Sequence, residues 1–319
     1  MEKKDRKPPD SSSIPRFAGI KTFMRLPYER DVEGLDFAVM GLPFDTGATY
    51  RVGARFAPEA VRSISALIKP YNAFHKVNIF DYISGVDYGD LNVIPGYIMD
   101  TYEAVAEEMK LFTDSNVIPV VIGGDHSVTV PQLRALAKKH GPMALVHFDA
   151  HLDTADSYFG KKYTHGTPFS RAHDEGLLIS EKTIQIGMRG TYYGEHSLKE
   201  STDRGFSVIS IDEVFDMGLD NVIKLIHEKV GDSKVFVTFD IDALDPAYAP
   251  GTGTLIPGGF TSREAFKLIR GLAGLDFAGF DVVEVLPDLD PCNITSALAS
   301  NIVFEFLSLI ALKEKMRKK

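Results

Sequence analysis

Residues 143–153 read M-A-L-V-H-F-D-A-H-L-D, an apolar run that ends in three possible metal ligands. These ligands are Asp149, His151 and Asp153, and they occupy every second position. In an extended backbone, residues two apart share a face, so this spacing directs two carboxylates and an imidazole toward one point. Such a set suits a divalent Mn, Fe, Ni or Zn ion. Without a cation these groups are costly to bury, and we therefore expect a metal site.

Apolar runs of strand character recur along the chain and alternate with segments of helical character. The predicted strands are 37–42, 83–86, 117–122, 143–148, 183–187, 207–211, 235–239 and 280–285. The predicted helices are 57–67, 100–114, 130–139, 220–230 and 262–272, followed by an amphipathic closing helix at 302–315. The alternation predicts a three-layer α/β/α fold with a mainly parallel sheet of about eight strands. We expect a flexible arm over residues 1–13. We expect a single domain over residues 14–319, because this stretch contains no linker and no break in composition.

Polar groups follow three of the predicted strands at their carboxyl ends, where parallel sheets bind ligands. G-G-D-H-S (123–127) follows the run 117–122, and Asp240-Ile241-Asp242 follows the run 235–239. A fourth strand carries another acid, because Glu284 lies within the last predicted strand, in V-V-E-V. An acid inside an apolar strand near such a site favours a functional role over a buried ion pair.

Six residues at these strand ends are candidate metal ligands. They are His126, Asp149, His151, Asp153, Asp240 and Asp242. Six ligands are too many for one tetrahedral zinc ion, which takes four, and they suit two ions that share carboxylates. Two metals about 3.5–4 Å apart lower the pKa of water enough to supply hydroxide near neutral pH. The set therefore predicts a hydrolase.

The same motifs carry a resemblance to a known family. They are G-G-D-H-S (123–127), H-F-D-A-H-L-D (147–153), H-G-T-P-F (165–169) and F-D-I-D-A-L-D-P-A-Y-A-P-G-T-G-T (239–254). From about residue 14 onward, the chain resembles the ureohydrolase family of arginases, agmatinases, formiminoglutamases and guanidino-acid hydrolases. The long fourth motif and V-V-E-V resemble the agmatinase branch.

The resemblance implies an arginase-like fold, a homo-oligomer (trimer or hexamer) and two Mn²⁺ per chain, with Ni²⁺ as an alternative. One ion would bind His126, Asp149, Asp153 and Asp240, and the other Asp149, His151, Asp240 and Asp242. Glu284 would pair with the guanidinium group of the substrate. His165 would shuttle a proton to the leaving amine, and Asp153 would orient the hydroxide. The products would be urea and an amine.

The substrate is open among small guanidino compounds. We predict an agmatinase, which converts agmatine and water to putrescine and urea; the alternatives are 4-guanidinobutyrase, 3-guanidinopropionase and a free-guanidine hydrolase. Lys161 and Lys162 would favour a carboxylate tail if they pointed into the cleft, whereas adjacent loop lysines are usually solvated. Leu286, beside Glu284, is larger than the residue that relatives carry and is predicted to narrow the substrate pocket.

Two polar residues beside the motifs are interpreted as structural. We predict that Asp125 supports the turn next to His126 and that His147 is a hydrogen-bonded core residue, so that neither binds metal directly.

Composition limits the partners. The formal net charge of −9 over 319 residues disfavours nucleic acid and anionic membranes. The single cysteine, Cys292, excludes a disulfide framework and fits a reducing compartment, so we expect a cytoplasmic protein. The start of the chain lacks the pattern of a secretory signal, and no apolar run approaches the length that spans a bilayer.

Three other classes compete with this interpretation. A catalytically silent binding or regulatory protein of the same fold is disfavoured by the intact ligand set. A two-metal phosphoesterase is disfavoured by the lack of Arg or Lys clamps in the core motifs. A single-zinc deacetylase of the same fold is disfavoured by the six-ligand count.

Overall fold

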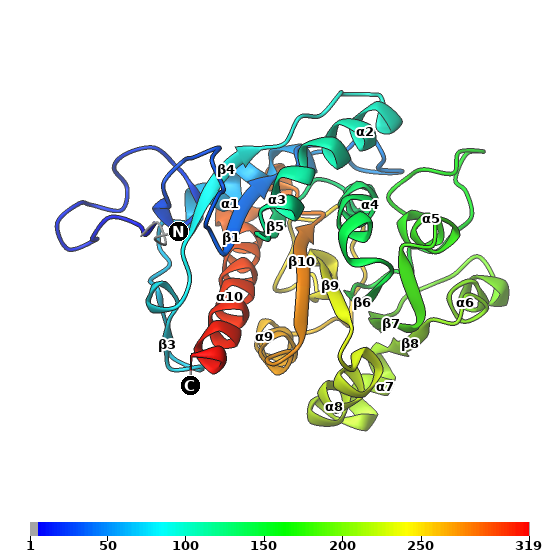
Figure 1. Cartoon of the computed structure of the whole chain (residues 1–319). Coiled ribbons are helices and arrows are strands. Elements are labelled where there is room, and N and C mark those ends of the chain that lie inside the picture. The colour runs from blue at the N-terminus through cyan, green and yellow to red at the C-terminus, as the bar shows by residue number, and fades with distance from the viewer. Residues whose placement is uncertain (1–5, 319) are drawn as a thin grey trace.

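The computed structural model describes residues 6–318, in which helices cover both faces of a central sheet (Figure 1). The sheet has the strand order β4-β1-β5-β10-β9-β6-β7-β8, and its neighbouring strands are parallel. The strands are β1 (Phe37–Gly41), β4 (Gly85–Asp90), β5 (Ile118–Ile122), β6 (Met143–Phe148), β7 (Leu178–Met188), β8 (Ser207–Ser210), β9 (Lys234–Asp240) and β10 (Asp276–Val283). A separate hairpin joins β2 (Tyr71–Asn72) and β3 (Val77–Asn78). Each predicted strand overlaps one strand of the large sheet, so the predicted fold class is confirmed.

Two groups of helices make the outer layers. The helices are α1 (Ala57–Ser65), α2 (Ile98–Glu108), α3 (Lys110–Asp114), α4 (Thr129–His140), α5 (Pro168–Asp174), α6 (Glu195–Thr202), α7 (Ile211–Met217), α8 (Leu219–Val230), α9 (Ser262–Gly271) and α10 (Ile294–Arg317). Helices α2 to α5 pack beside one another on one face, while α1, α10, α9, α8 and α7 form a row on the other. Helix α6 lies at the β8 edge of the sheet (Figure 1).

The central strands are buried at almost every position, as a sheet covered on both faces requires. Val120 of β5, Val146 of β6 and Val237 of β9 are fully buried. Near-continuous apolar runs therefore identify these strands in the sequence, because both faces of each strand contact helices. This packing fixes the strand ends rigidly, and the candidate site lies at those ends.

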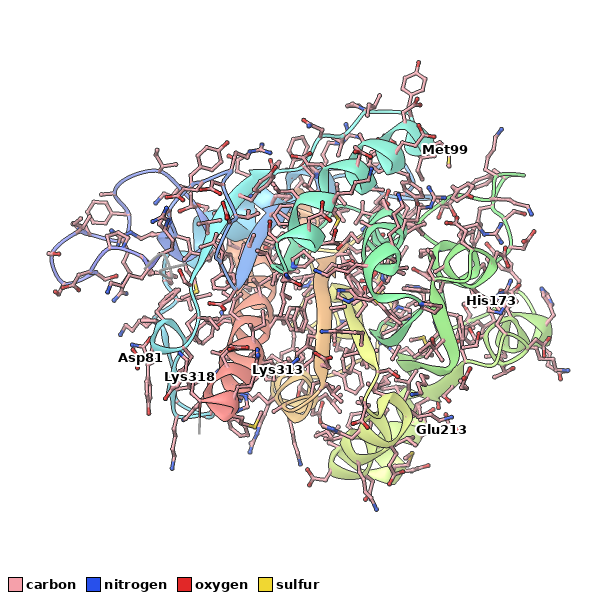
Figure 2. All side chains as sticks on the ribbon, viewed as in Figure 1. Asp81, Met99, His173, Glu213, Lys313 and Lys318 are labelled. Atoms are coloured by element: carbon pink, nitrogen blue, oxygen red, sulfur yellow. The ribbon has the colours of Figure 1, made fainter. Side chains whose placement is uncertain are left out.

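Helix starts follow local sequence signals. Helix α9 begins after Thr261, whose hydroxyl accepts from the Glu264 backbone N–H while the Glu264 carboxylate accepts from the Thr261 N–H. Ser210 and Glu213 make the same reciprocal pair at the start of α7, where the side chain of Glu213 projects from the surface (Figure 2). These capping boxes satisfy backbone donors that the first helical turn leaves free.

The closing helix differs from its prediction. It begins at Ile294 rather than at residue 302, and it is buried on most of its circumference instead of being amphipathic. It packs against α1, α9 and β10, and Lys313 pairs with Asp276 of β10 (Figure 2). The helical segment 291–317 has the length and hydropathy of a membrane span, but 78% of its apolar window is buried inside the fold. The expectation that no apolar segment reaches that length was therefore wrong. The segment is long and apolar because it forms a helix of the protein core.

The predicted arm at residues 1–13 is described only from Arg6 onward. The Arg6 guanidinium pairs with Glu29 at 2.8 Å, and its backbone N–H donates to Ser84 Oγ at 3.0 Å. The predicted boundary between arm and domain stays a prediction.

Candidate active site

Four adjacent strands in the middle of the sheet carry the predicted site residues. The strand order places β5, β10, β9 and β6 side by side. His126 follows β5, Glu284 follows β10, Asp240 ends β9 and Asp149 follows β6. Because these strands are parallel, their carboxyl ends share one edge of the sheet, and residues distant in sequence meet there.

Turns after the strands bring the side chains together. β6 ends before Asp149, whose Oδ1 accepts from the His151 backbone N–H at 2.6 Å. Asp153 has a positive φ of 52°. Asp240 Oδ1 likewise accepts from the Asp242 N–H at 2.8 Å. The sequence argument from strand alternation was therefore wrong about the backbone, because aspartate side chains that bond the backbone two residues ahead shape both turns.

The first cluster of side chains surrounds His126. Its Nδ1 lies 3.1 Å from Asp149 Oδ2 and 3.0 Å from Asp153 Oδ2. It also lies 3.3 Å from Asp240 Oδ2. The other ring nitrogen, Nε2, lies 2.9 Å from Thr238 Oγ1. If Nε2 donates to this hydroxyl, Nδ1 presents its lone pair to the centre of the cluster. This Nδ1 is buried and has no hydrogen-bond partner among residues 6–318, as expected for a metal ligand.

The second cluster surrounds His151 and shares Asp149 with the first. His151 Nδ1 lies 3.3 Å from Asp149 Oδ1 and 3.1 Å from Asp242 Oδ2. Asp149 thus turns Oδ2 toward His126 and Oδ1 toward His151. This is the arrangement that a carboxylate bridging two ions requires. The two clusters have the membership that the resemblance implies, except that no contact joins Asp240 to His151.

The buried carboxylates of the two clusters favour the binding of cations. Burial, together with the charges of Asp242 and Asp149, raises the pKa of Asp240 well above its ordinary value. Burial also raises the pKa of Asp242. Four ionised carboxylates, those of the four aspartates in the two clusters, carry a charge of −4, which two divalent ions would neutralise. The donor set of carboxylates and imidazoles therefore fits a binuclear centre.

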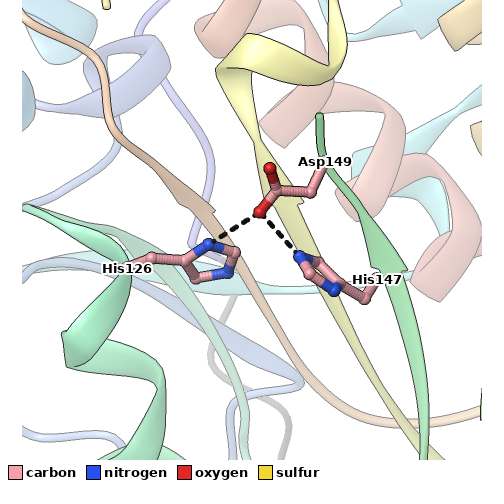
Figure 3. A group of neighbouring side chains, drawn as sticks. All are labelled: His126, His147 and Asp149. Carbon is pink, nitrogen blue, oxygen red and sulfur yellow. Dashed lines mark hydrogen bonds and ion pairs between the residues drawn. The ribbon is translucent and has the colours of Figure 1, made fainter. Parts of the chain in front are cut away.

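His147 lies against the first cluster, and Figure 3 shows it on the opposite side of Asp149 from His126. Its Nε2 lies 2.8 Å from Asp149 Oδ2, and Gln185 donates to its Nδ1 at 2.9 Å. The Gln185 amide also donates to the Leu152 carbonyl at 2.6 Å. With both ring nitrogens engaged, His147 is a hydrogen-bonded core residue that orients Asp149. Sequence reasoning missed Gln185, which reaches the site only across neighbouring strands.

Glu284 and His165 form a pair beside the metal ligands. Glu284 has a φ of 63°, and its Oε1 accepts from the His126 backbone N–H at 2.9 Å. His165 Nδ1 lies 2.8 Å from the same oxygen. Burial opposes protonation of His165, but the charge and hydrogen bond of Glu284 dominate and raise its pKa to about 9. Glu284 therefore favours the protonated form of His165, which can give up a proton.

The loop at residues 45–49 completes this pair. The Thr49 backbone N–H donates to His165 Nε2 at 3.1 Å, and the Thr49 hydroxyl lies 2.8 Å from the same nitrogen. Asp125 holds the loop, because its Oδ2 accepts from the Gly47 N–H at 2.8 Å and its Oδ1 accepts from the Ser127 N–H at 3.0 Å. Both oxygens of Asp125 thus support turns, in agreement with its predicted structural role. Sequence reasoning missed Thr49, for which no local pattern gives a signal.

Arg189 holds the loops on the other side of the site in place through hydrogen bonds. Sequence reasoning also missed this residue. Its buried guanidinium donates to main-chain carbonyls, among them those of Asp242 at 2.6 Å and Ile256 at 2.8 Å. Further carbonyl contacts reach Gly187 and Leu244. The arginine therefore fixes the turn that presents the Asp242 carboxylate.

The cleft above these residues has a volume of about 730 Å³, and its walls include His151, Asp153 and His165. Lys161 and Lys162 are exposed and are not among the residues that line it. Leu286 is buried beside Gly53 and Gly253, and it does not line the cleft either. The prediction that Leu286 narrows the pocket was therefore wrong, because its side chain packs beneath the surrounding loops.

Comparison with known proteins identifies the family. A family model described as "Arginase family" matches residues 35–308. The chain belongs to the arginase family. It is 42% identical over 303 residues to a mitochondrial agmatinase of Gallus gallus, covering 95% of this chain and 89% of that protein. It is 39% identical to a guanidinobutyrase of Pseudomonas aeruginosa, covering 97% and 98%. The solved structure of proclavaminate amidinohydrolase from Streptomyces clavuligerus superposes with a TM-score of 0.90 at 44% identity, covering 94% of this chain and 99% of that one.

Membership of the arginase family sets the reaction class. The chain is an arginase-family hydrolase that acts on a guanidino C–N bond. The family is one of binuclear metal enzymes, and the His/Asp clusters described above are suited to hold the metals. The matched relatives differ in the substrate that their names specify, so the family alone leaves the substrate open.

Proposed function

We propose that the protein is an agmatinase, which hydrolyses agmatine to putrescine and urea. The observation that carries this proposal is the charge of the cleft that leads to Glu284 and His165. Its walls include the carboxylates of Asp153, Asp156 and Glu200, and among residues 6–318 no lysine lines it. Arg189 also lines the cleft, but its guanidinium donates to main-chain carbonyls. An acidic cleft attracts a substrate that is cationic at both ends and opposes one with a carboxylate tail.

The chain's own residues supply binding, orientation and proton transfer. Two divalent ions held by the six ligands would supply hydroxide near neutral pH. Glu284 accepts hydrogen bonds from the planar guanidinium and places its carbon beside the clusters. Asp153 accepts a hydrogen bond from the nucleophile and orients it. His165, held as the imidazolium by Glu284, donates its proton to the amine that leaves as the C–N bond breaks.

We further propose Mn²⁺ as the metal, with Ni²⁺ as the alternative, since oxygen and nitrogen ligands accept both. A homo-oligomer, a trimer or hexamer, is proposed from the resemblance, and a cytoplasmic location from the lone cysteine. Elemental analysis of the purified protein and light scattering after gel filtration test the first two proposals. Fewer than two ions per chain would contradict the binuclear site.

A guanidino-acid hydrolase is the second candidate. It is favoured by the similarity to a protein named guanidinobutyrase along 97% of this chain. The exposed positions of Lys161 and Lys162 remove the sequence argument for a carboxylate-binding cleft. The two candidates therefore predict opposite preferences for the charge on the substrate tail.

Urea release from a panel of substrates decides between the candidates. The panel contains agmatine, arginine, 4-guanidinobutanoate, 3-guanidinopropanoate and free guanidine, each with the Mn²⁺-loaded enzyme. We expect the highest kcat/KM for agmatine. A preference for either guanidino acid would replace the first candidate by the second, and no urea from any of them would overturn both candidates.

A further inference from the structure

Helix α6 forms one wall of the active-site cleft. Its residues His196 and Glu200 line the cleft, as do Tyr158 and Tyr192. In Figure 1, α6 lies at the outer edge of the molecule, next to β8 and remote from the centre of the sheet. The metal ligands lie at the sheet, so this helix faces a part of the substrate other than the guanidinium.

The carboxylate of Glu200 makes no hydrogen bond or ion pair within the part of the chain that the structure describes, residues 6–318, although the charges of Arg204 and His196 act on it. Arg204 Nη1 donates to the main-chain carbonyl of Glu200 rather than to its side chain, and Arg204 is not among the residues that line the cleft. Burial raises the pKa of Glu200 above its ordinary value. An acid that is partly desolvated and unpaired gains most from a cation that enters the cleft.

The other carboxylates of the cleft are already engaged. Asp156 accepts a hydrogen bond from Arg171 Nη2 at 2.8 Å. Asp153 Oδ2 lies 3.0 Å from His126 Nδ1, inside the first metal cluster. Glu200 is therefore the cleft acid in the described chain that is free to bind a charged group of the substrate.

Tyr158 lines the cleft together with Glu200 and Asp153. Burial raises the pKa of its hydroxyl, and the charges of Asp153 and of Glu200 raise it further. The ring packs on the backbone at Gly166, where an added Cβ would come within 2.7 Å of Cε2. Asp153, Tyr158 and Glu200 thus share the cleft into which the substrate chain would extend.

We propose that Glu200 binds the tail of the substrate and makes the enzyme selective for guanidines that end in a primary ammonium group. The inference rests on the proposed agmatinase function and adds a residue to it. A carboxylate forms charge-assisted hydrogen bonds with an ammonium group and repels a carboxylate, so one residue both favours agmatine and rejects guanidino acids.

Three substrates of similar length test this role, because they differ chiefly in the tail. Agmatine ends in an ammonium group, its isostere pentylguanidine in a methyl group and 4-guanidinobutanoate in a carboxylate. The Mn²⁺-loaded full chain is compared with Glu200→Gln and with Glu195→Gln. Glu195 lies on the same helix, is exposed and pairs with Lys199 at 3.0 Å, so its variant is a matched control. Ratios of kcat/KM between substrates cancel any loss of folded or metal-loaded enzyme.

We expect wild type and Glu195→Gln to prefer agmatine over pentylguanidine by about tenfold in kcat/KM. In Glu200→Gln this ratio falls to near one, chiefly through a higher KM for agmatine, while hydrolysis of 4-guanidinobutanoate improves. If wild type hydrolyses agmatine and Glu200→Gln keeps its selectivity, the role of Glu200 is overturned and the proposed function stands. If wild type does not hydrolyse agmatine, the proposed function is overturned, and the role of Glu200 with it.

Discussion

His165 donates from Nδ1 to Glu284 Oε1 over 2.8 Å, and this hydrogen bond joins the proposed proton donor to the proposed guanidinium ligand. The same oxygen accepts from the His126 backbone N–H at 2.9 Å. One carboxylate thus connects a metal-cluster residue, the substrate site and the imidazole. His165 lies in the loop between β6 and α5, and Glu284 follows β10, so the fold brings together two residues that are 119 positions apart.

The first prediction concerns the pH dependence of this pair. Glu284 raises the pKa of His165 to about 9, so the imidazole holds its proton below that pH and loses it as the pH rises. Because the imidazolium donates the proton, kcat/KM should fall on the alkaline side, through about pH 9. Glu284→Gln should move the titration of His165 to lower pH, which NMR of ¹⁵N-histidine-labelled protein measures. An unchanged titration in that variant would contradict the pairing.

The second prediction concerns Thr49, whose hydroxyl lies 2.8 Å from His165 Nε2. The Thr49 backbone N–H donates to the same nitrogen at 3.1 Å, so the hydroxyl is the group of Thr49 that can accept a proton from Nε2 when His165 is protonated. Thr49→Val should therefore lower kcat/KM about fivefold, which corresponds to the loss of one hydrogen bond of about 1 kcal/mol. It should also shift the alkaline limb of the pH profile of kcat/KM to lower pH. Thr49→Ser keeps the hydroxyl and should retain both values. Equal behaviour of the two variants would exclude the hydroxyl from the proton path.

The third prediction concerns Asp149, whose two oxygens face His126 and His151 at 3.1 and 3.3 Å. Asp149→Ala should reduce bound Mn²⁺ below two ions per chain and lower kcat/KM about a thousandfold or more, since the metal pair supplies several kcal/mol. Chelation should lower the unfolding temperature of wild type, because the ions bind only the folded state. Asp220→Asn, an exposed acid paired with Lys267, is the control and should keep both ions. Two tightly held ions in Asp149→Ala would refute the bridging role.

Much of the fold follows from the sequence because continuous apolar runs mark strands that are covered on both faces. Each predicted strand was found, and so were the long helices. The short helices α5, α6 and α7 were not predicted, because seven or eight residues show too little periodicity. Likewise, the predicted helix 100–114 is two helices, which meet at Met109.

The residues of the candidate site also fall into two groups, those that the sequence reveals and those that only the structure reveals. Its acids and histidines stand in contiguous motifs, so the sequence reveals them together. Thr49, by contrast, contacts His165 across 116 residues of chain, and Gln185 contacts His147 across 38. Each acts through one or two hydrogen bonds that only the folded sheet creates. Residues of this kind become visible with the structure.

The fourth prediction concerns Gln185, which donates to His147 Nδ1 at 2.9 Å and to the Leu152 carbonyl at 2.6 Å. Because the Gln185 amide donates to Nδ1, the proton of neutral His147 stays on Nε2, and Nε2 donates it to Asp149. Gln185→Leu releases that constraint, and the metal dissociation constant should rise about 10–100-fold. Thr183→Val is the matched control on the same strand, since Thr183 is buried and its hydroxyl bonds the Ile179 carbonyl. Competition with a fluorescent chelator measures both variants, and equal affinities would contradict the prediction.

The last prediction concerns Gly124, where two segments of backbone approach closely. A Cβ at this position would lie 1.6 Å from the Phe44 carbonyl oxygen, and backbone atoms rather than a flexible side chain would have to move. The same oxygen accepts from the Asp125 N–H at 2.9 Å, so the shift would also disturb the loop that carries Thr49. Gly124→Ala should therefore lower the free energy of unfolding by about 3 kcal/mol, measured by urea denaturation. Gly253→Ala is the control, because the nearest atom to its Cβ would be 3.4 Å away. If both variants unfold at the same urea concentration, the close approach at Gly124 does not limit side-chain size.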